Sequence, residues 1–295
     1  MFEQLGLIGC GLMGGSFALA LKKAGLVRRV VGYSKSPATT ARALQLGVID
    51  SAVTEAAQAA AGSDLVLLAV PVAATEATLR SIRTQLTAQT LVMDVGSTKV
   101  DVAQAAAQAL GDQLPCFVPA HPITGKEVAG VDHADAQLYQ GAQVVLTPTA
   151  LTQDSLVQRA QALWQALGCR VSVMAPELHD NALAAVSHLP HLLAFAMMRS
   201  MLRQADGDTY LSLAGPGFRD FTRIGAGDPQ IWRDILLANK KEVLAQAREF
   251  QLALQELEQA METDDATALQ TLLTSASQSR LQWTMGQAMA SVHKD

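Results

Sequence analysis

Short apolar runs alternate with helix-like segments along the first 174 residues. Several runs are continuously apolar, as expected for strands that are buried on both faces. The predicted strands are Leu5–Ile8, Val30–Tyr33, Leu65–Val70, Leu91–Val95, Phe117–Ala120, Val144–Leu146 and Val171–Met174. The segments between them, such as Ser16–Lys23, Pro37–Leu46 and Val100–Leu110, have helical periodicity. This order predicts an α/β domain with a mostly parallel sheet, covered by helices and joined by right-handed crossovers.

The pattern changes after Met174, where no further strand of comparable strength occurs. We expect one or two helices over Pro176–Gln204, bent or broken near Pro190. Helical periodicity resumes at Asp228, with Asp-Pro as N-cap and first-turn residue. An apolar seam then recurs at spacings of four and three: Val243, Ala247, Phe250, Leu254, Leu257 and Met261. The predicted domains are therefore 1–174 and 175–295. The seam is explained either by packing within the chain or by a homodimer contact.

Composition narrows the class of protein. The chain has 295 residues and a net charge of −5, so it lacks the basic surface that nucleic-acid binding needs. The three cysteines, an odd number without CxxC spacing, indicate reduced thiols and a cytoplasmic protein. The N-terminus lacks the basic start of a signal peptide, and the longest apolar run, 65–74, is too short to span a membrane.

A glycine-rich turn follows the first predicted strand. Gly9, Gly11 and Gly14 have the GxGxxG spacing, and the predicted helix begins at Leu12 and Met13. In a Rossmann domain these glycines permit the tight turn, the approach of a pyrophosphate and close helix–strand packing. GxGxxG alone is a weak signal, and the alternative is a turn without a ligand. Its place between strand and helix favours a dinucleotide site.

The end of the second strand bears on the choice of nucleotide. An NAD site usually has Asp or Glu there to bind the ribose 2′-hydroxyl. This chain instead has Ser34 and Lys35, which suit a 2′-phosphate, although Lys35 alone could be a solvated surface residue. We therefore expect NADP, with NAD possible. Two later strand ends, at Val70-Pro71 and Gly96-Ser97, should also meet the cofactor, because ligands bind at the carboxyl ends of parallel strands.

Three histidines are candidates for the chemistry. His121 follows a predicted strand and precedes a proline, where it could serve as a general base or merely support a loop. His188 and His191 are three residues apart, on one helical face. An HxxH pair can bind metal, but no third ligand follows at metal spacing. We expect these two histidines to contact the substrate or to pack in the core.

A glycine-rich segment, 215–225, contains two arginines. The guanidinium of Arg223 could bind a carboxylate, and Asp220, three residues earlier, could orient it. The alternative is a polar loop between helices.

Together these motifs resemble the prephenate and arogenate dehydrogenase family of tyrosine biosynthesis. The matching segments are GLIGCGLMGGS from Gly6, DVGSTK at Asp94–Lys99, AHPITGKE at Ala120–Glu127, SHLPH at Ser187–His191 and Gly217–Ile235. They occur in the family's order over most of the chain. Each segment is weak alone, but the set is specific.

The resemblance implies oxidative decarboxylation of a small cyclohexadienyl acid by a Rossmann domain followed by a helical dimerisation domain. It makes His121 the acceptor of the ring hydroxyl proton and Ser97 a partner of that hydroxyl and the nicotinamide. Arg223, nine residues before Trp232, would bind the side-chain carboxylate. His188 and His191 match pocket histidines, and Glu127 matches a polar gate residue.

Lys126 and Thr124 depart from the family pattern, in which many members have Thr or Ser and Ala at these positions. Lys126 could bind a substrate carboxylate or be solvated, which leaves the choice between prephenate and arogenate open. The Ser34-Lys35 pair resembles NADP-using arogenate dehydrogenases and favours arogenate, with prephenate also accepted. The rival interpretations are a β-hydroxyacid dehydrogenase, a pyrroline-carboxylate reductase, or a nucleotide-binding sensor without turnover.

Overall fold

The computed structural model describes residues 1–126 and 128–285. The strands are β1 Phe2–Ile8, β2 Val27–Tyr33, β3 Ser51–Ala52, β4 Leu65–Leu68, β5 Leu91–Asp94, β6 Phe117–Val118, β7 Ala120–Ile123, β8 Gln143–Leu146 and β9 Arg170–Val173. The α-helices are α1 Leu12–Lys23, α2 Pro37–Gln45, α3 Ala56–Ala60, α4 Thr75–Ile82, α5 Val100–Leu110, α6 Asp154–Ala166, α7 Pro176–Leu183, α8 Leu189–Leu202, α9 Gly207–Ser212, α10 Pro216–Thr222, α11 Pro229–Ala238, α12 Lys240–Glu262 and α13 Ala266–Gln282. A π-helical turn, Ala184–His188, joins α7 to α8. Short 3₁₀ turns lie at Val72–Ala74, Arg83–Gln85, Gly111–Cys116, Val131–His133 and Arg223–Ala226.

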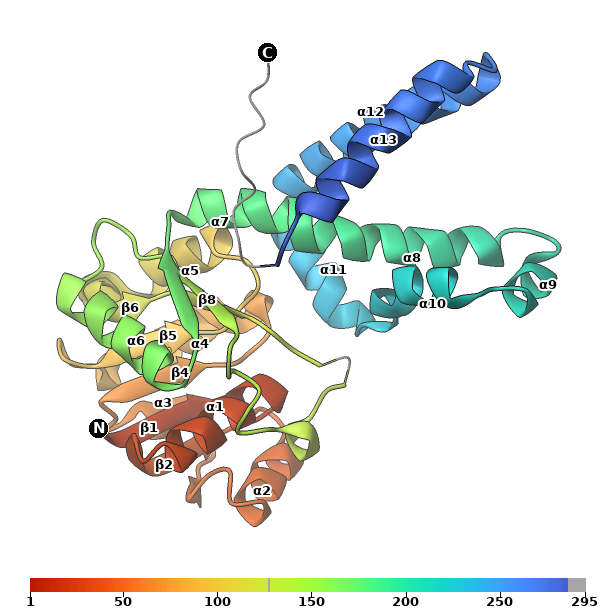
Figure 1. The fold of residues 1–295 in the computed structure, drawn as a ribbon. Helices are drawn as coiled ribbons and strands as arrows, with labels where there is room; N and C mark the ends of the chain where they lie inside the picture. The colour runs from red at the N-terminus through yellow and green to blue at the C-terminus, as the bar shows by residue number, and fades with distance from the viewer. Residues whose placement is uncertain (127, 286–295) are drawn as a thin grey trace. The chain divides into compact units, whose positions relative to one another are not determined.

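Six strands form one parallel sheet, in the order β3-β2-β1-β4-β5-β6 (Figure 1). The strand order reverses between β1 and β4, and this switch point is where ligands bind in open α/β sheets. The continuously apolar strands β4 and β5 are buried at every position, which is why their sequences lack alternation. The prediction of a Rossmann-type α/β fold with an all-helical C-terminal part is confirmed.

Helices cover both faces of this sheet. Gly6 in β1 faces α3, since a Cβ there would lie 2.4 Å from the carbonyl oxygen of Ala59. Leu7, the next residue, contacts Gly14 of α1 on the opposite face. The helices α3, α4 and α5 pack side by side behind the sheet, while α1 and α6 lie in front of it (Figure 1). Because side chains alternate along β1, the helix α1 and the helix α3 lie on opposite faces of the sheet.

A second sheet follows, in the order β7-β8-β9, with β7 antiparallel to β8 and β8 parallel to β9. The predicted strand Phe117–Ala120 is therefore wrong in one respect. It divides at Pro119: β6 ends the large sheet, and β7 begins the small one. A proline has no backbone N–H for a sheet ladder, which makes it a natural break. The sequence pattern also failed to indicate the two-residue strand β3.

The chain from Pro176 to Leu202 is one helical run of 27 residues. Pro190 lies in the first turn of α8, directly after the π-helical turn. The helical run continues past this proline without a break. Among the described residues, this helix alone has the length and apolar composition of a membrane span, a test that helices in folded cores also pass. The helical run carries His188 and His191, so the π-helical turn within it affects where these two side chains lie.

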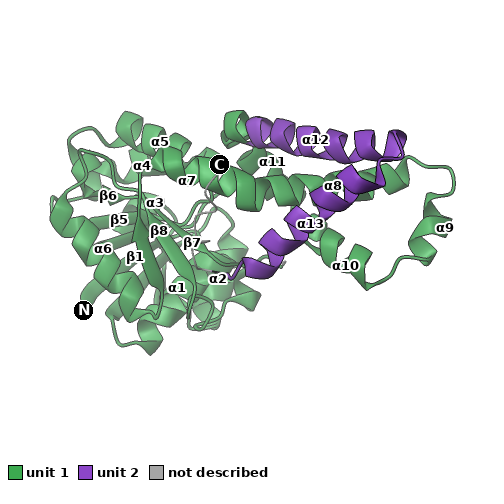
Figure 2. Cartoon of the chain, turned by 45° about the horizontal axis from the view of Figure 1, so that its top comes forward, with its two compact units in different colours: residues 1–242 green, residues 243–295 purple. Residues whose placement is uncertain are grey.

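The residues divide into two compact units, Met1–Glu242 and Val243–Asp295 (Figure 2). The predicted cap at Asp228 is confirmed, because its carboxylate accepts the backbone N–H groups of Gln230 and Ile231. On α12, Phe250, Leu254 and Met261 of the apolar seam are exposed. The predicted boundary near residue 174 stays a prediction.

Candidate active site

The glycine turn is shaped by contacts that exclude side chains. Gly9 has φ of 101°, and a Cβ there would lie 2.2 Å from the carbonyl oxygen of Ala69. A Cβ on Gly14 would lie 2.1 Å from the oxygen of Gly9. A Cβ on Gly11 would meet nothing within 4 Å, so the space above the turn is open. No side chain caps the N-terminus of α1, which leaves its first N–H groups available to a pyrophosphate. The turn therefore fits a dinucleotide.

The end of β2 provides the second part of the nucleotide site. Gly9 N–H donates to the carbonyl oxygen of Tyr33 at 2.8 Å, which holds this strand end beside the glycine turn. Ser34 is half-buried and Lys35 is exposed. Ser36 caps α2 by accepting the N–H of Thr39. The Ser34 and Lys35 side chains therefore follow the strand end that is bonded to the glycine turn.

A cavity of about 320 Å³ continues from the glycine turn. The predicted cofactor residues that line it are Met13, Val70, Pro71 and Gly96. The opposite wall comes from α11, with Ile231, Asp234 and Ile235. Ser97 also lines this cavity, at the carboxyl end of β5. The predicted strand ends thus meet along one groove, as the parallel topology requires.

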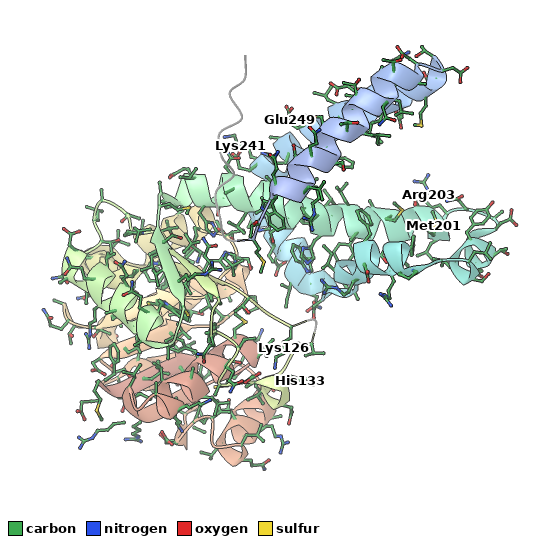
Figure 3. All side chains as sticks on the ribbon, viewed as in Figure 1. Lys126, His133, Met201, Arg203, Lys241 and Glu249 are labelled. Atoms are coloured by element: carbon green, nitrogen blue, oxygen red, sulfur yellow. The ribbon has the colours of Figure 1, made fainter. Side chains whose placement is uncertain are left out.

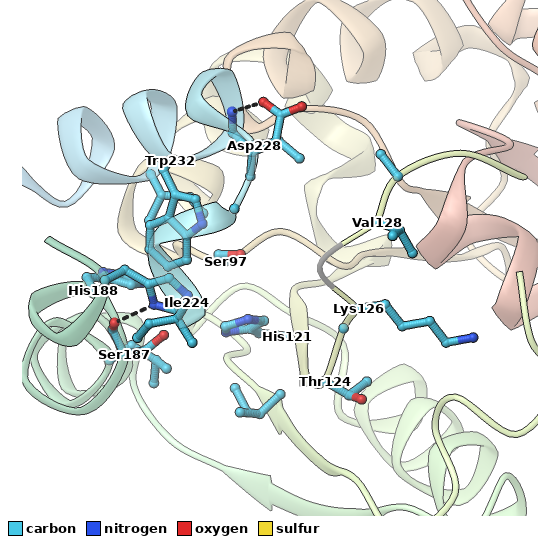
Figure 4. A pocket seen from close by; sticks show the side chains of 18 of the residues that line it. Ser97, His121, Thr124, Lys126, Val128, Ser187, His188, Ile224, Asp228 and Trp232 are labelled. Carbon is cyan, nitrogen blue, oxygen red and sulfur yellow. Dashed lines mark hydrogen bonds between the residues drawn. The ribbon is translucent and has the colours of Figure 1, made fainter. Parts of the chain in front are cut away.

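A second cavity, of about 450 Å³, adjoins the first at Ser97 (Figure 4). Seven predicted site residues line it: Ser97, His121, Lys126, His188, His191, Arg223 and Trp232. They come from five separate segments of the chain. The sequence did not single out Ser187, Ile224 or Ile231, which also line it. Tertiary folding alone brings these segments together.

His121 is buried in the wall of this cavity, on β7. Burial and the nearby His179 and Lys99 lower its pKa well below the usual value for histidine. Buried Lys99 bonds to the carboxylate of Asp94 and donates to the carbonyl oxygen of Ala120 at 2.9 Å. Asp94 also accepts the N–H of Ala120 at 3.0 Å. This ion pair joins the Ser97 loop to the strand that carries His121, and the histidine is neutral near pH 7.

The other two histidines flank Trp232. His191 stacks on the Trp232 ring at 3.6 Å between centroids, and its Nδ1 donates to the carbonyl oxygen of Ser187 at 3.0 Å. The His188 ring meets Trp232 edge-on, with 6.3 Å between centroids. Burial lowers the pKa of His188 to about 4, so it too is neutral near pH 7. The π-helical turn that ends at His188 places both rings on the cavity wall.

Three further residues were predicted to contact the substrate: Asp220, Lys126 and Glu127. Asp220 is exposed, lies outside the cavity lining and pairs with Arg219 at 2.9 Å, and a role of Asp220 in orienting Arg223 stays a prediction. The Lys126 ammonium turns to Asp135 and to the carbonyl oxygen of His133, each at 3.2 Å (Figure 3). Glu127 lies outside the described residues.

Three buried residues behind the cavity wall were not predicted from the sequence. His179, Asp180 and Asn239 are buried: His179 bonds to His121, Asn239 bonds to His188, and Asp180 bonds to both His179 and Asn239. An adjacent His-Asp pair within an apolar helix was an available signal for the first two. No comparable signal marked Asn239, which interrupts the predicted helix between α11 and α12. Among residues 1–126 and 128–285, no group of three or more His, Cys, Asp or Glu could hold a metal ion.

A Rossmann cradle that opens into a cavity with a neutral histidine and an arginine defines a nicotinamide-dependent dehydrogenase of a small acid. Two family models match the chain: the prephenate dehydrogenase nucleotide-binding domain over residues 17–173, and the dimerization domain over residues 175–275. The chain belongs to the prephenate dehydrogenase family.

Known relatives agree with this assignment. The cyclohexadienyl dehydrogenase of Zymomonas mobilis is 34% identical over 91% of this chain and 92% of its own length. Among solved structures, prephenate dehydrogenase from A. aeolicus, in complex with hydroxyphenyl propionate and NAD+, is 33% identical with a TM-score of 0.88. That match covers 95% of this chain and 98% of the other. Synechocystis arogenate dehydrogenase is 27% identical with a TM-score of 0.81, covering 96% of this chain and all of its own.

Proposed function

We propose that this chain catalyses the oxidative decarboxylation of arogenate, prephenate or both, in L-tyrosine biosynthesis, with NADP as the preferred hydride acceptor. The observation that carries the proposal is the position of Ser97. It lies where the cofactor groove meets the cavity that contains His121 and Arg223. A substrate held in that cavity has its reacting carbon beside the cofactor. The relatives bear the names of dehydrogenases of cyclohexadienyl substrates, prephenate and arogenate.

His121 takes the proton of the ring hydroxyl, and Ser97 bonds to the same oxygen. When bound, the nicotinamide cofactor accepts hydride from the carbon that bears this hydroxyl. The resulting dienone loses its ring carboxylate as carbon dioxide, and the electrons of the broken carbon–carbon bond make the ring aromatic. The phenolate oxygen regains a proton, so proton release balances proton uptake. The protein's own contribution is to position the substrate and to move this proton.

Arg223 binds the side-chain carboxylate with its guanidinium fork. His188 contacts the substrate, and His191 and Trp232 form a stacked wall beside it. Lys126 and Glu127 remain predicted substrate contacts. The bonds of Lys126 to Asp135 and to the carbonyl of His133 compete with that role.

The preference for NADP rests on Ser34 and Lys35 and on the absence of a carboxylate at the end of β2. A carboxylate would repel a 2′-phosphate, whereas a hydroxyl and an ammonium bind one. Lys35→Ala should raise KM for NADP by about fivefold, the effect of one exposed charge pair, and leave KM for NAD unchanged. A lower KM for NAD than for NADP in the unaltered protein would refute the preference.

One experiment tests the activity. The purified chain is assayed for reduced-nicotinamide absorbance with prephenate and arogenate, each with NAD and with NADP. We expect turnover of at least one substrate, with arogenate preferred. Binding of NADP without turnover of either substrate would instead support the nucleotide-binding sensor.

We also propose a cytoplasmic homodimer formed through the helical part. The family model of residues 175–275 describes a dimerization domain, and Phe250, Leu254 and Met261 leave an exposed apolar seam on α12. A second copy would bury these side chains. Sedimentation velocity should find a mass near twice 31.2 kDa, and a monomer would contradict the proposal.

A further inference from the structure

A chain of buried contacts leads from His121 away from the cavity. His121 Nδ1 lies 2.9 Å from His179 Nε2, and His179 Nδ1 lies 2.7 Å from Asp180 Oδ1. His179 is fully buried, and Asp180 is 3% exposed. Neither residue lines either of the two cavities at the site. His179 therefore reaches the site through His121.

The carboxylate fixes the direction of these hydrogen bonds. Asp180 accepts the backbone N–H groups of Lys99 at 2.8 Å and Val100 at 2.9 Å, which anchors it in place. An ionised carboxylate only accepts, so His179 Nδ1 carries a proton and donates it. A single ring proton on Nδ1 leaves His179 Nε2 as an acceptor, and His121 Nδ1 then donates to it. Neutral His121 thus holds its one N–H on Nδ1, and its Nε2 lone pair is left for the cavity.

A second branch of buried contacts starts from Asp180. Asn239 Nδ2 donates to the main-chain oxygen of Asp180 at 2.7 Å and lies 3.1 Å from His188 Nδ1. The carbonyl oxygen only accepts, which requires the amide nitrogen rather than its oxygen on this side. His188 Nδ1 is therefore an acceptor, and neutral His188 carries its proton on Nε2. Within the described residues that Nε2 has no hydrogen-bond partner, although His188 is 1% exposed and lines the cavity.

We propose that His179, Asp180 and Asn239 are positioning residues that set the two cavity histidines in opposite tautomers. His121 presents an acceptor at Nε2, which takes the substrate hydroxyl proton. His188 carries a donor at Nε2, buried in the cavity wall and without a partner among the described residues, for a substrate oxygen that reaches it. The roles toward substrate rest on the proposed function, whereas the tautomers are properties of the unliganded protein.

Opposite tautomers prevent the two histidines from exchanging roles. If His121 carried its proton on Nε2, it would meet the substrate hydroxyl with a donor and could not act as base. In the serine proteases, the wrong tautomer at the catalytic histidine costs about 10⁴ in kcat. We expect a loss of about 10²–10⁴ here, within the range of general-base assistance.

The test uses the full chain with ¹⁵N-labelled histidine and long-range ¹H–¹⁵N spectra near pH 7, without ligand. The chain has six histidines, so the spectrum is simple, and single substitutions assign it. We expect His121 and His179 protonated at Nδ1, and His188 protonated at Nε2. A proton on Nε2 of His121, or on Nδ1 of His188, overturns the proposal without any variant. An imidazolium at His179 does the same.

Variants then connect the tautomers to turnover. In Asp180→Asn, an amide donor can face His179 Nδ1 and reverse the relay, so we expect His121 to move to the Nε2–H tautomer. kcat should fall by about 10²–10⁴ with cofactor affinity unchanged. Asn239→Leu should instead randomise the His188 tautomer and raise KM more than it lowers kcat. The exposed His133→Gln is the matched control, with unchanged tautomers and rates.

The outcomes separate this proposal from the proposed function. Expected tautomers with no turnover of prephenate or arogenate would refute the function and leave the assignment of the tautomers intact. Turnover of the substrate with either histidine in the other tautomer would refute the positioning role alone. Loss of kcat in Asp180→Asn while His121 stays protonated at Nδ1 would also refute it.

Discussion

The two halves of the site are built in different ways. The cofactor cradle is made of backbone: Gly9, Gly11 and Gly14 are there because a side chain would fill or block the space. The substrate cavity is made of side chains from distant segments, held by a buried network around Asp180. A substitution in the cradle therefore acts through shape, whereas one in the cavity acts through charge and proton position. Substitutions in the cradle and in the cavity should therefore have different effects.

The largest effect is expected at His121. His121→Asn removes the base and keeps a polar side chain of similar size, so kcat should fall by about 10²–10⁴. The cradle is untouched, and the dissociation constant for the cofactor should stay the same in fluorescence titration. Near-normal turnover in this variant would remove His121 from the role of base and weaken the contrast between the two halves.

Two arginines provide a matched pair. Arg223 lines the cavity, whereas Arg219 is exposed and pairs with Asp220. Arg223→Ala should raise KM for the substrate roughly 10- to 150-fold, the value of a hydrogen bond to a charged group at about 1.5–3 kcal/mol. Arg219→Ala loses the same guanidinium and should change KM less than about twofold, because exposed pairs contribute little. Equal effects on KM would mean that the carboxylate is bound elsewhere.

Two glycines separate shape from ligand contact in the cradle. Gly14→Ala should lower the free energy of unfolding by about 1–3 kcal/mol, because the methyl group has no room beside Gly9. Gly11→Ala meets no neighbour and should leave stability unchanged while weakening dinucleotide binding. Thermal unfolding and cofactor titration measure the two effects. A stable Gly14→Ala protein with normal cofactor affinity would refute the backbone account.

The smallest effect is a shift in pH dependence. Burial, His179, Lys99 and His188 disfavour the His121 imidazolium and lower its pKa. The base form persists as pH falls, and the acid limb of kcat/KM should lie below pH 6.5, the usual value for histidine. Rates from pH 4.5 to 8 measure it, and an acid limb above 6.5 would contradict the structure.

The stability of the folded protein limits how far the pH can be lowered in these rate measurements. The folded-state pKa of His188 is lowered to about 4, against about 6.5 in the unfolded chain. Between these values the unfolded state binds more protons, so stability decreases as pH falls from 6.5 towards 4. Unfolding measured at each pH keeps this loss apart from the titration of His121.

Local pattern was enough where the contacts are local. The runs that form β4 and β5 are apolar because both faces are buried, and the glycine turn follows β1 within three residues. The cap at Asp228 likewise depends only on its next three residues. Asp220, in contrast, has two arginines near it in sequence, and the structure pairs it with Arg219. Helical spacing permits a contact and does not choose between two neighbouring arginines.

The sequence by itself determined the Rossmann domain, the dinucleotide turn and the residue types available for catalysis. Only the tertiary structure decided the division of the chain at Pro119 between two sheets, and the meeting of His121, Arg223 and Trp232 around one cavity. It also decided the direction of the hydrogen bonds that link Asp180, His179 and His121. His121 and His179 are 58 residues apart, and Asn239 and Asp180 are 59 apart. Hydrogen bonds over such separations depend on how whole elements pack, which no local pattern records.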